Sequence, residues 1–235
     1  MIFNVSTLIN FLRSEVFLKQ INHFNRINLK NLIFNKSFIQ STKDIKEFLI
    51  MTIEIDDAGT GDLVGDAFIG FLRKKTGEIV FKTLPVELFK EDNWKNKQPF
   101  KVVVELVRDG LKDLNFQKDT EIIHLCRGNI FDQVRNYFLE EGIYYEDAIV
   151  EGKLQDAIEG KLVDHLRNDL GVRSKYLTKK SGAKRFFVLF NWVSYHFYKR
   201  EKYVKSGFKK WNTVWRDRAI EKNKKIIDTR ANRRY

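Results

Sequence analysis

Hydrophobic and polar positions change their period several times along the middle of the chain, and each change predicts a new element. Thr52–Ala58 alternates with period two and places Ile53 and Ile55 on one face, which predicts a strand. Two further apolar runs, Ala67–Arg73 and Glu78–Thr83, are separated only by a short polar segment that ends in glycine. That arrangement is typical of a β-hairpin.

Helical periods follow the hairpin. Val103, Val107 and Leu111 recur at helical spacing and predict an amphipathic helix over Val102–Leu114. The same reasoning predicts, in order, a strand at Glu121–Cys126, a helix from an Asn129 cap to Gly142, a strand at Tyr144–Val150, and a helix at Lys153–Leu170 that Gly171 ends. The order β-β-β-α-β-α-β-α predicts an α/β fold with a mixed sheet and helices on its faces.

The last quarter of the chain reads as a basic helical segment. Ser174–Gly182 is predicted to be a basic loop, and Lys184–Lys205 and Phe208–Asn223 are predicted to be helices. An apolar stripe on the first helix is expected to pack inward, and it comprises Phe186, Phe190, Val193 and Phe197. The chain therefore divides into an N-terminal extension (1–50), an α/β domain (51–172) and a basic, aromatic-rich arm (173–235).

The N-terminal extension differs in composition from the rest. Residues 1–50 contain no glycine, and 27 of them are Asn, Ile, Phe or Lys. Because Met51 directly precedes the first predicted strand, we expect translation to start there, or residues 1–50 to be dispensable. The alternative is an organelle-targeting peptide, since Glu15 is the only acidic residue before Thr42.

Charge is distributed unevenly around a net +12. Residues 173–235 contain 20 Lys and Arg against 4 Asp and Glu, whereas residues 51–172 contain 16 basic and 24 acidic residues. Concentrated positive charge attracts polyanions, of which nucleic acid is the commonest. The alternative interpretation is a solvated surface that serves solubility.

Cysteine content and hydropathy limit the class of protein further. The single cysteine, Cys126, excludes a disulfide framework and a cysteine-rich zinc site, and it favours a reducing, cytoplasmic location. We interpret Cys126 as a core residue. No stretch approaches the roughly 18 consecutive apolar residues that a membrane span needs, so no membrane partner is expected.

The most specific motif follows the first predicted strand and reads Asp-Asp-Ala-Gly-Thr-Gly-Asp-Leu-Val-Gly from Asp56 to Gly65. It resembles the first-strand motif of ribonuclease HII, Asp-Glu-Ala-Gly-Arg-Gly-Pro-Leu-Val-Gly. In that resemblance Asp56 falls on the first metal-binding carboxylate and Asp57 on the neighbouring glutamate. Gly59 and Gly61 fall on the glycines whose backbone approaches the substrate strand.

The motif also departs from the family at two positions. Thr60 stands where the family has an arginine that helps to recognise the ribonucleotide junction, and Asp62 stands where it has proline. The resemblance therefore implies a ribonuclease H-like fold and a metal-dependent nuclease without the substrate preference of ribonuclease HII. An acidic turn of ordinary Asp and Gly residues is the alternative.

Nuclease chemistry in this fold requires Mg²⁺ or Mn²⁺ held by carboxylates from separate elements. The fourth strand usually ends in such an acid, but here it ends in Cys126. Glu151 and Asp156 are the remaining candidates, because we expect the last helix to begin beside Asp56. Asp156 and Glu159 share one face of that helix, whereas the period of two places Asp57 on the strand face opposite Asp56.

Nucleic-acid contacts are expected from the glycine-rich loop and from the basic arm. The candidate residues are Gly59, Thr60, Gly61, Lys184, Arg185, Lys199, Arg200, Lys209 and Lys210. The sequence thus predicts a metal-dependent nuclease for structured nucleic acid: an RNA/DNA hybrid, a duplex or branched DNA. Ribonuclease and junction resolvase remain open within that class. A non-catalytic nucleic-acid-binding protein of the same fold, and a scaffold whose basic arm meets an acidic protein, are the alternatives.

Overall fold

The computed structural model describes residues 52–177 and 182–232. The chain divides into two compact units, of which the second, Ile50–Tyr235, contains all the described residues. Predictions for residues 1–50 and for part of the basic loop (178–181) lie outside the described residues.

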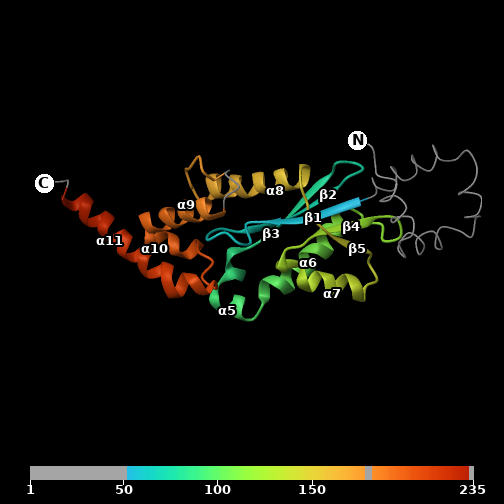
Figure 1. Ribbon diagram of the computed structural model, residues 1–235, viewed down its shortest axis with the longest axis horizontal. Coiled ribbons are helices and arrows are strands. Elements are labelled where there is room, and N and C mark those ends of the chain that lie inside the picture. The colour runs from blue at the N-terminus through green and yellow to red at the C-terminus, as the bar shows by residue number, and fades with distance from the viewer. Residues whose placement is uncertain (1–51, 178–181, 233–235) are drawn as a thin grey trace, which may run out of the picture. The chain divides into compact units, whose positions relative to one another are not determined.

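A five-stranded mixed sheet forms the centre of the described unit (Figure 1). Its order is β3-β2-β1-β4-β5, and the strands are β1 (Thr52–Ala58), β2 (Ala67–Arg73), β3 (Ile79–Leu84), β4 (Ile122–Cys126) and β5 (Tyr145–Ala148). β2 pairs antiparallel with both β1 and β3, whereas β4 runs parallel to both β1 and β5. The predicted α/β class and mixed sheet are confirmed, and β1 and β2 have the predicted bounds.

Helices cover the sheet and continue beyond it. They comprise α5 (Glu91–Lys95), α6 (Gln98–Asp113), α7 (Asp132–Glu140), α8 (Lys153–Asp164), α9 (Gly182–Tyr195), α10 (Phe197–Arg200) and α11 (Arg216–Asn232). Short 3-10 turns occupy Val86–Phe89, Asn129–Phe131 and Glu201–Tyr203, and π-helical turns occupy His165–Asp169 and Trp211–Trp215. Within the described ranges no helix is long and apolar enough to cross a membrane.

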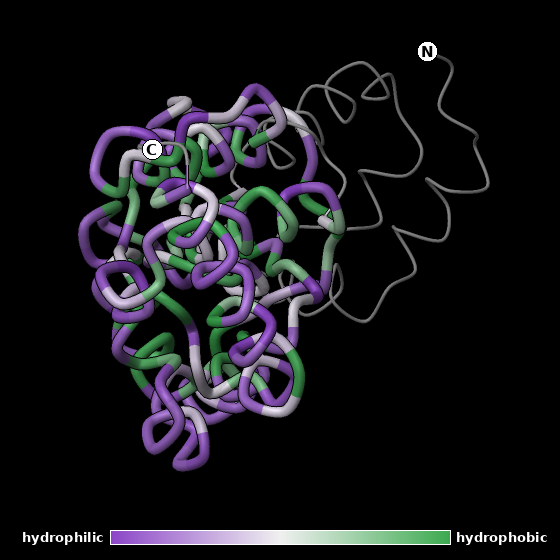
Figure 2. The backbone as a smooth tube through the Cα atoms, turned by 90° about the vertical axis from the view of Figure 1, so that its left-hand side faces the viewer, coloured by the Kyte–Doolittle hydropathy of each residue, from purple (hydrophilic) through white to green (hydrophobic). Residues whose placement is uncertain are grey.

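The two faces of the sheet have separate cores. Ile53 and Ile55 on β1 pack in one cluster with apolar side chains of α6 and α7. The opposite face is covered by α8, whose Ile158 and Leu162 belong to a second cluster. Figure 2 shows hydrophobic segments toward the interior of the unit and hydrophilic segments around them.

The C-terminal segment is part of that second core, which is a correction to the expected separate arm. Leu189, Val193 and Phe197 are buried together with Leu63 and Val64 from the β1–β2 loop. Alternation between aromatic and basic residues in 184–215 therefore reflects packing against the sheet domain. Of the stripe expected to pack inward, Phe190, Val193 and Phe197 are buried, and Phe186 is partly buried.

Several predicted boundaries are wrong. The helix over Lys184–Lys205 is interrupted at His196, whose backbone leaves the helical region (φ −144°, ψ 57°), and the chain then pairs Val204 with Val64 in an antiparallel bridge. Asn129 lies inside a 3-10 turn, and no side chain caps that turn or α7. α6 begins at Gln98 rather than Val102, since Pro99 suits the first turn of a helix.

Candidate functional site

Three potential ligand side chains meet where β1 and β4 end. One ligand atom from each of Asp56, Asp57 and Cys126 lies within 4.8 Å of the other two. β1 and β4 are adjacent and parallel, so their carboxyl ends share one edge of the sheet. Ligands of open α/β sheets bind at such edges, which makes this group the candidate site.

Asp57 lies at this edge together with Asp56, although the period of two places the two side chains on opposite faces of β1. It is the penultimate residue of β1, and its carboxylate accepts a 2.5 Å hydrogen bond from the Thr60 hydroxyl. A side chain at the very end of a strand can reach the shared edge from the opposite face. The two carboxylates therefore act on one another, and Asp56 is among the causes that raise the pKa of Asp57.

Burial dominates the electrostatics of both carboxylates. Asp56 is only 7% exposed, and burial raises its pKa, while a hydrogen bond with the Cys126 thiol acts in the opposite direction. Burial raises the pKa of Asp57 to about 6, offset in part by Thr60 and by Lys205. Both acids therefore sit in surroundings that penalise their charge, and a bound cation would relieve that penalty.

Cys126 packs against two of the core clusters, in line with the core position expected from sequence, and its thiol also lies beside the two aspartates. It is half-buried and ends β4, the strand end at which the resemblance implied a further carboxylate. Burial and the hydrogen bond with Asp56 raise the pKa of its thiol to about 12. The thiol is therefore protonated at neutral pH and offers no negative charge to the site.

Glu151 and Asp156 do not join the group, although both were predicted to be metal ligands. Both side chains are exposed, and α8 begins at the wrong end of β1 for Asp156 to reach it. Lys153 in the first turn of α8 donates to the Gly77 carbonyl in the β2–β3 turn, beside the start of β1 rather than its end. One turn further along α8, Glu159 lies closer to the site, and after burial its charge is one of the smaller causes that raise the pKa of Asp56 and Asp57.

An ion network from the C-terminal segment supports the glycine-rich loop. Arg185 on α9 donates from Nε to Asp62 at 3.0 Å and from Nη1 to Glu159 at 2.7 Å. Asp62 is only 8% exposed, so Arg185 is the partner that offsets the burial of its charge. Arg185 was predicted to contact nucleic acid, and it is instead an internal ion-pair partner.

Lys205 is the residue that sequence analysis missed altogether. Its side chain is fully buried and donates to the Gly59 carbonyl, and its backbone N–H donates to Leu63 at 2.9 Å. Burial lowers the pKa of Lys205 to about 8, against the opposite effects of Asp62, Asp66 and Asp57 in that order. Only the long-range bridge between residues 64 and 204 brings this lysine under the loop, so no local pattern could have predicted it.

The two loop glycines differ in what they offer a ligand. Gly59 is buried with φ +84°, and an added Cβ would lie 2.8 Å from Leu162, so glycine is required there by both conformation and space. Gly61 is exposed, and nothing lies within 4 Å of the position that its Cβ would take. Gly61, rather than Gly59, is the glycine whose backbone a substrate strand could approach.

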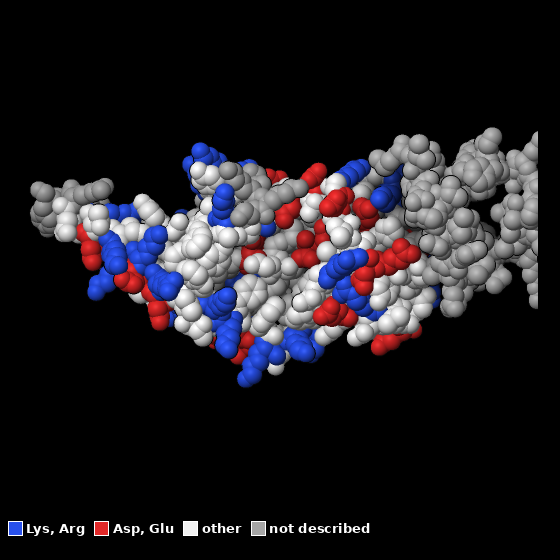
Figure 3. Space-filling model, in the orientation of Figure 1, with Lys and Arg blue, Asp and Glu red and all other residues white. Residues whose placement is uncertain are grey.

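The remaining basic candidates also separate into two kinds. Lys184, Lys199, Lys209 and Lys210 are exposed. Arg200 is partly buried, stacks 4.3 Å from the Trp192 ring and donates to the Trp192 carbonyl at 2.7 Å. Figure 3 shows acidic side chains near the centre of one face and basic side chains along α11 and the lower edge.

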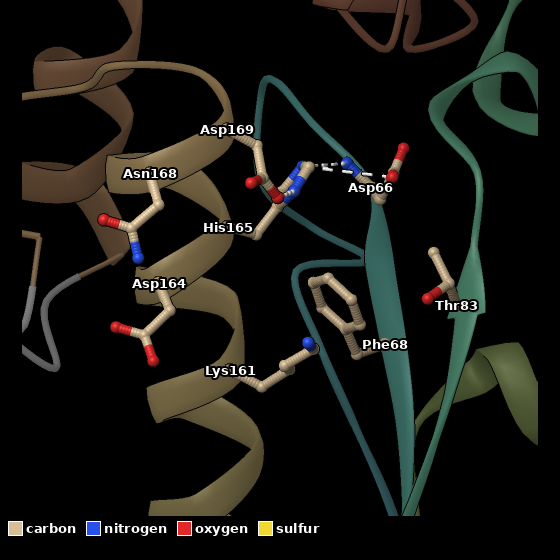
Figure 4. A pocket seen from close by; sticks show the side chains of 8 residues that line it. All are labelled: Asp66, Phe68, Thr83, Lys161, Asp164, His165, Asn168 and Asp169. Atoms are coloured by element: carbon tan, nitrogen blue, oxygen red, sulfur yellow. Dashed lines mark hydrogen bonds and ion pairs between the residues drawn. The ribbon is translucent and has the colours of Figure 1, made fainter.

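A cavity separate from the aspartate pair lies on the α8 side of β2, and Figure 4 shows His165 at its centre. Nε2 of His165 accepts from the Asp66 backbone N–H at 3.1 Å, and Nδ1 lies 2.8 Å from the Asp169 carboxylate. Asp66 in turn accepts from the Val86 N–H at 2.8 Å. Both imidazole nitrogens are engaged, so His165 fixes the end of the loop that follows Asp56 and is not a free base.

The sequence matches no protein-family model, and no curated protein is significantly similar to it.

Proposed function

We propose that this chain is a metal-dependent nuclease with a ribonuclease H-like fold that hydrolyses phosphodiester bonds in structured nucleic acid. The observation that carries the proposal is the pairing of Asp56 and Asp57 at the shared carboxyl edge of β1 and β4. Three antiparallel strands followed by two parallel ones support the same class, since the ribonuclease H order begins with β-β-β and then alternates.

The donor set fits a hard divalent cation better than a soft one. Asp56 and Asp57 supply carboxylate oxygens, which Mg²⁺ and Mn²⁺ prefer, and Mg²⁺ commonly binds one or two carboxylates while keeping several waters. The protonated Cys126 thiol is a poor ligand for either ion. A cation held by the two aspartates would polarise a phosphoryl oxygen and lower the pKa of a bound water.

The chain's own residues prepare the acids for that cation. Thr60 holds the Asp57 carboxylate in one orientation. Lys205 and Arg185 fix the β1–β2 loop through hydrogen bonds to Gly59 and Asp62. The raised pKa of both aspartates means that proton and cation compete for the same oxygens. Binding of the cation should therefore strengthen as pH rises through about 6.

A non-catalytic nucleic-acid-binding protein of the same fold is the second candidate. It is favoured by one observation: β4 ends in a neutral thiol beside Asp56. Among the described residues, the group at that edge contains two carboxylates and no third, which would support one cation, whereas many phosphodiesterases use two.

A cleavage assay distinguishes these candidates. The full chain is incubated with labelled substrates and an excess of Mg²⁺ that saturates a weak carboxylate site. An RNA/DNA hybrid, a DNA duplex and a four-way DNA junction should be compared, each with chelator and with Mn²⁺. Cleavage of any of them that chelator abolishes supports the nuclease. Tight binding without cleavage in either metal supports the second candidate.

A further inference from the structure

An aromatic cavity lies directly beyond the glycine-rich loop. It has a volume of about 360 Å³, near the lower end of the roughly 300–1,000 Å³ typical of small-ligand pockets. Gly61 and Leu63 from the loop form one side, and Trp94 from α5 and aromatic side chains of residues 186–215 form the rest. Gly61 is four residues after Asp57, so the candidate metal site and this cavity border the same loop.

The walls of the cavity are two aromatic pairs that leave part of their rings exposed. Trp94 and Phe208 meet edge to face at 5.1 Å between centroids, and Phe186 and Trp215 do so at 4.9 Å. All four side chains are half-buried. Aromatic faces of this kind accept a nucleobase of any identity by stacking.

The segments that carry these pairs are fixed to each other. Gly207 donates to the Phe89 carbonyl at 2.8 Å, and a Cβ at Gly207 would collide with Trp94. Asn212 hydrogen-bonds both the Glu91 carboxylate and the Ser206 carbonyl. The cavity is therefore built by contacts between distant parts of the chain, and it does not depend on one surface helix.

Positive charge lies at the same cavity. Lys209 and Lys210 line it and are exposed, and within residues 52–177 and 182–232 neither side chain forms an ion pair. Cations beside an aromatic surface match the two parts of a nucleotide, because the base stacks while the phosphate is held by charge.

We infer that this cavity binds an unpaired nucleobase of a single-stranded segment, with Lys209 and Lys210 on its phosphates. The strand would pass over the exposed Gly61 between the cavity and Asp57. The inference rests on the proposed nucleic-acid function and adds to it a requirement for unpaired nucleotides next to the scissile bond.

The test measures binding in chelator, where cleavage is absent. The unchanged full-length protein is titrated with a labelled 12-nucleotide single strand and with the same strand in which every base is replaced by an abasic site. The phosphates are identical, so a cavity that stacks a base should bind the abasic strand about 10-fold more weakly. Equal affinity for the two strands, or no binding of either, would overturn the inference.

Protein variants then place the effect at the cavity. Trp215→Ala and the pair Lys209→Gln with Lys210→Gln should each weaken binding of the normal strand by about 10-fold, whereas Trp215→Phe keeps a stacking face and should retain most of it. Tyr198→Ala removes an aromatic ring that is 78% exposed and lies outside the cavity, so it is the matched control. If Tyr198→Ala loses as much affinity as Trp215→Ala, the base binds elsewhere.

These results are separable from those of the nuclease proposal. Discrimination against abasic strands without any metal-dependent cleavage would support the cavity and remove the nuclease. Metal-dependent cleavage with equal affinity for normal and abasic strands would do the reverse. Equal affinity for the normal and the abasic strand, together with displacement of both by a short apolar peptide, would identify the cavity as a protein-docking site. That result would overturn the inference.

Discussion

The C-terminal segment contains two sets of basic side chains that differ in solvent exposure and in what they contact. Arg185 and Lys205 are largely buried and donate hydrogen bonds to the β1–β2 loop, Arg185 to the Asp62 carboxylate and Lys205 to the Gly59 carbonyl. Lys209 and Lys210, only a few residues further, stay exposed beside an aromatic cavity. The difference teaches that a basic run in sequence is no single functional unit: part of it stabilises an acidic site, and the rest is available to a polyanion.

The largest effect should come from the buried set. Arg185→Ala leaves Asp62 buried without its partner, and removing one member of a buried ion pair costs about 3–5 kcal/mol of unfolding free energy. Urea denaturation of Arg185→Ala and Lys184→Ala measures this. Lys184 is the exposed neighbour on α9, and its substitution should change stability by no more than about 0.5 kcal/mol. Equal losses in the two variants would contradict the assignment of Arg185 to the interior.

The same contrast shows how far sequence reasoning reaches. Apolar positions predicted β1, β2 and α8, because both strands are buried along nearly their whole length and α8 buries Leu154, Ile158 and Leu162 at helical spacing. The motif likewise predicted Asp56 and Asp57 as site residues, since the resemblance implied both acids at the end of the first strand. Lys205 was not predictable, because it reaches the loop only through a bridge between residues 140 positions apart, Val64 and Val204. Asp156 was predicted beside Asp56, and wrongly, because sequence gives the face of a helix but not its height along a strand.

Acidic pH should act on the carboxylate pair with the sign opposite to that of an ordinary salt bridge. The pKa of Asp57 is raised from 3.8 to about 6, so the folded state binds more protons than the unfolded state between those values. The metal-free protein should therefore lose up to about 3 kcal/mol of stability from this group as pH rises from 4 to 6. The thermal midpoint of Asp57→Asn, compared with the wild type across that range in chelator, isolates the contribution. An identical pH dependence in both proteins would contradict the buried position of Asp57.

Cys126→Asp sharpens the comparison by adding negative charge beside two buried carboxylates. A third carboxylate next to Asp56 and Asp57 should destabilise the metal-free protein by about 2 kcal/mol, since each like charge raises the cost of the others. Mg²⁺ should then raise the melting temperature more in this variant than in the wild type, because three oxygens hold the ion better than two. Cys126→Ser, which stays neutral, is the control. A Mg²⁺ shift equal in all three proteins would mean that the ion binds elsewhere.

The smallest effect concerns the exposed set. Each phosphate neutralised on a single strand contributes about −0.7 to the slope of log K against log salt, so replacing Lys209 and Lys210 with glutamine should flatten that slope by about 1.4. Lys224→Gln with Lys225→Gln makes the same change of charge on exposed positions of α11. Binding isotherms at several salt concentrations compare the two double variants. A larger change from the α11 pair would place the nucleic acid along that helix instead of at the cavity.

The central claim is that Asp56 and Asp57 hold a catalytic divalent cation, and Asp56→Asn tests it most directly. The substitution keeps the shape of the side chain and removes its charge, so folding and nucleic-acid affinity in chelator should be unchanged. Metal-dependent cleavage of the best substrate should fall by more than about 100-fold, the upper range for residues that merely support a metal ligand. Wild-type cleavage by Asp56→Asn, with the same dependence on Mg²⁺, would contradict the account.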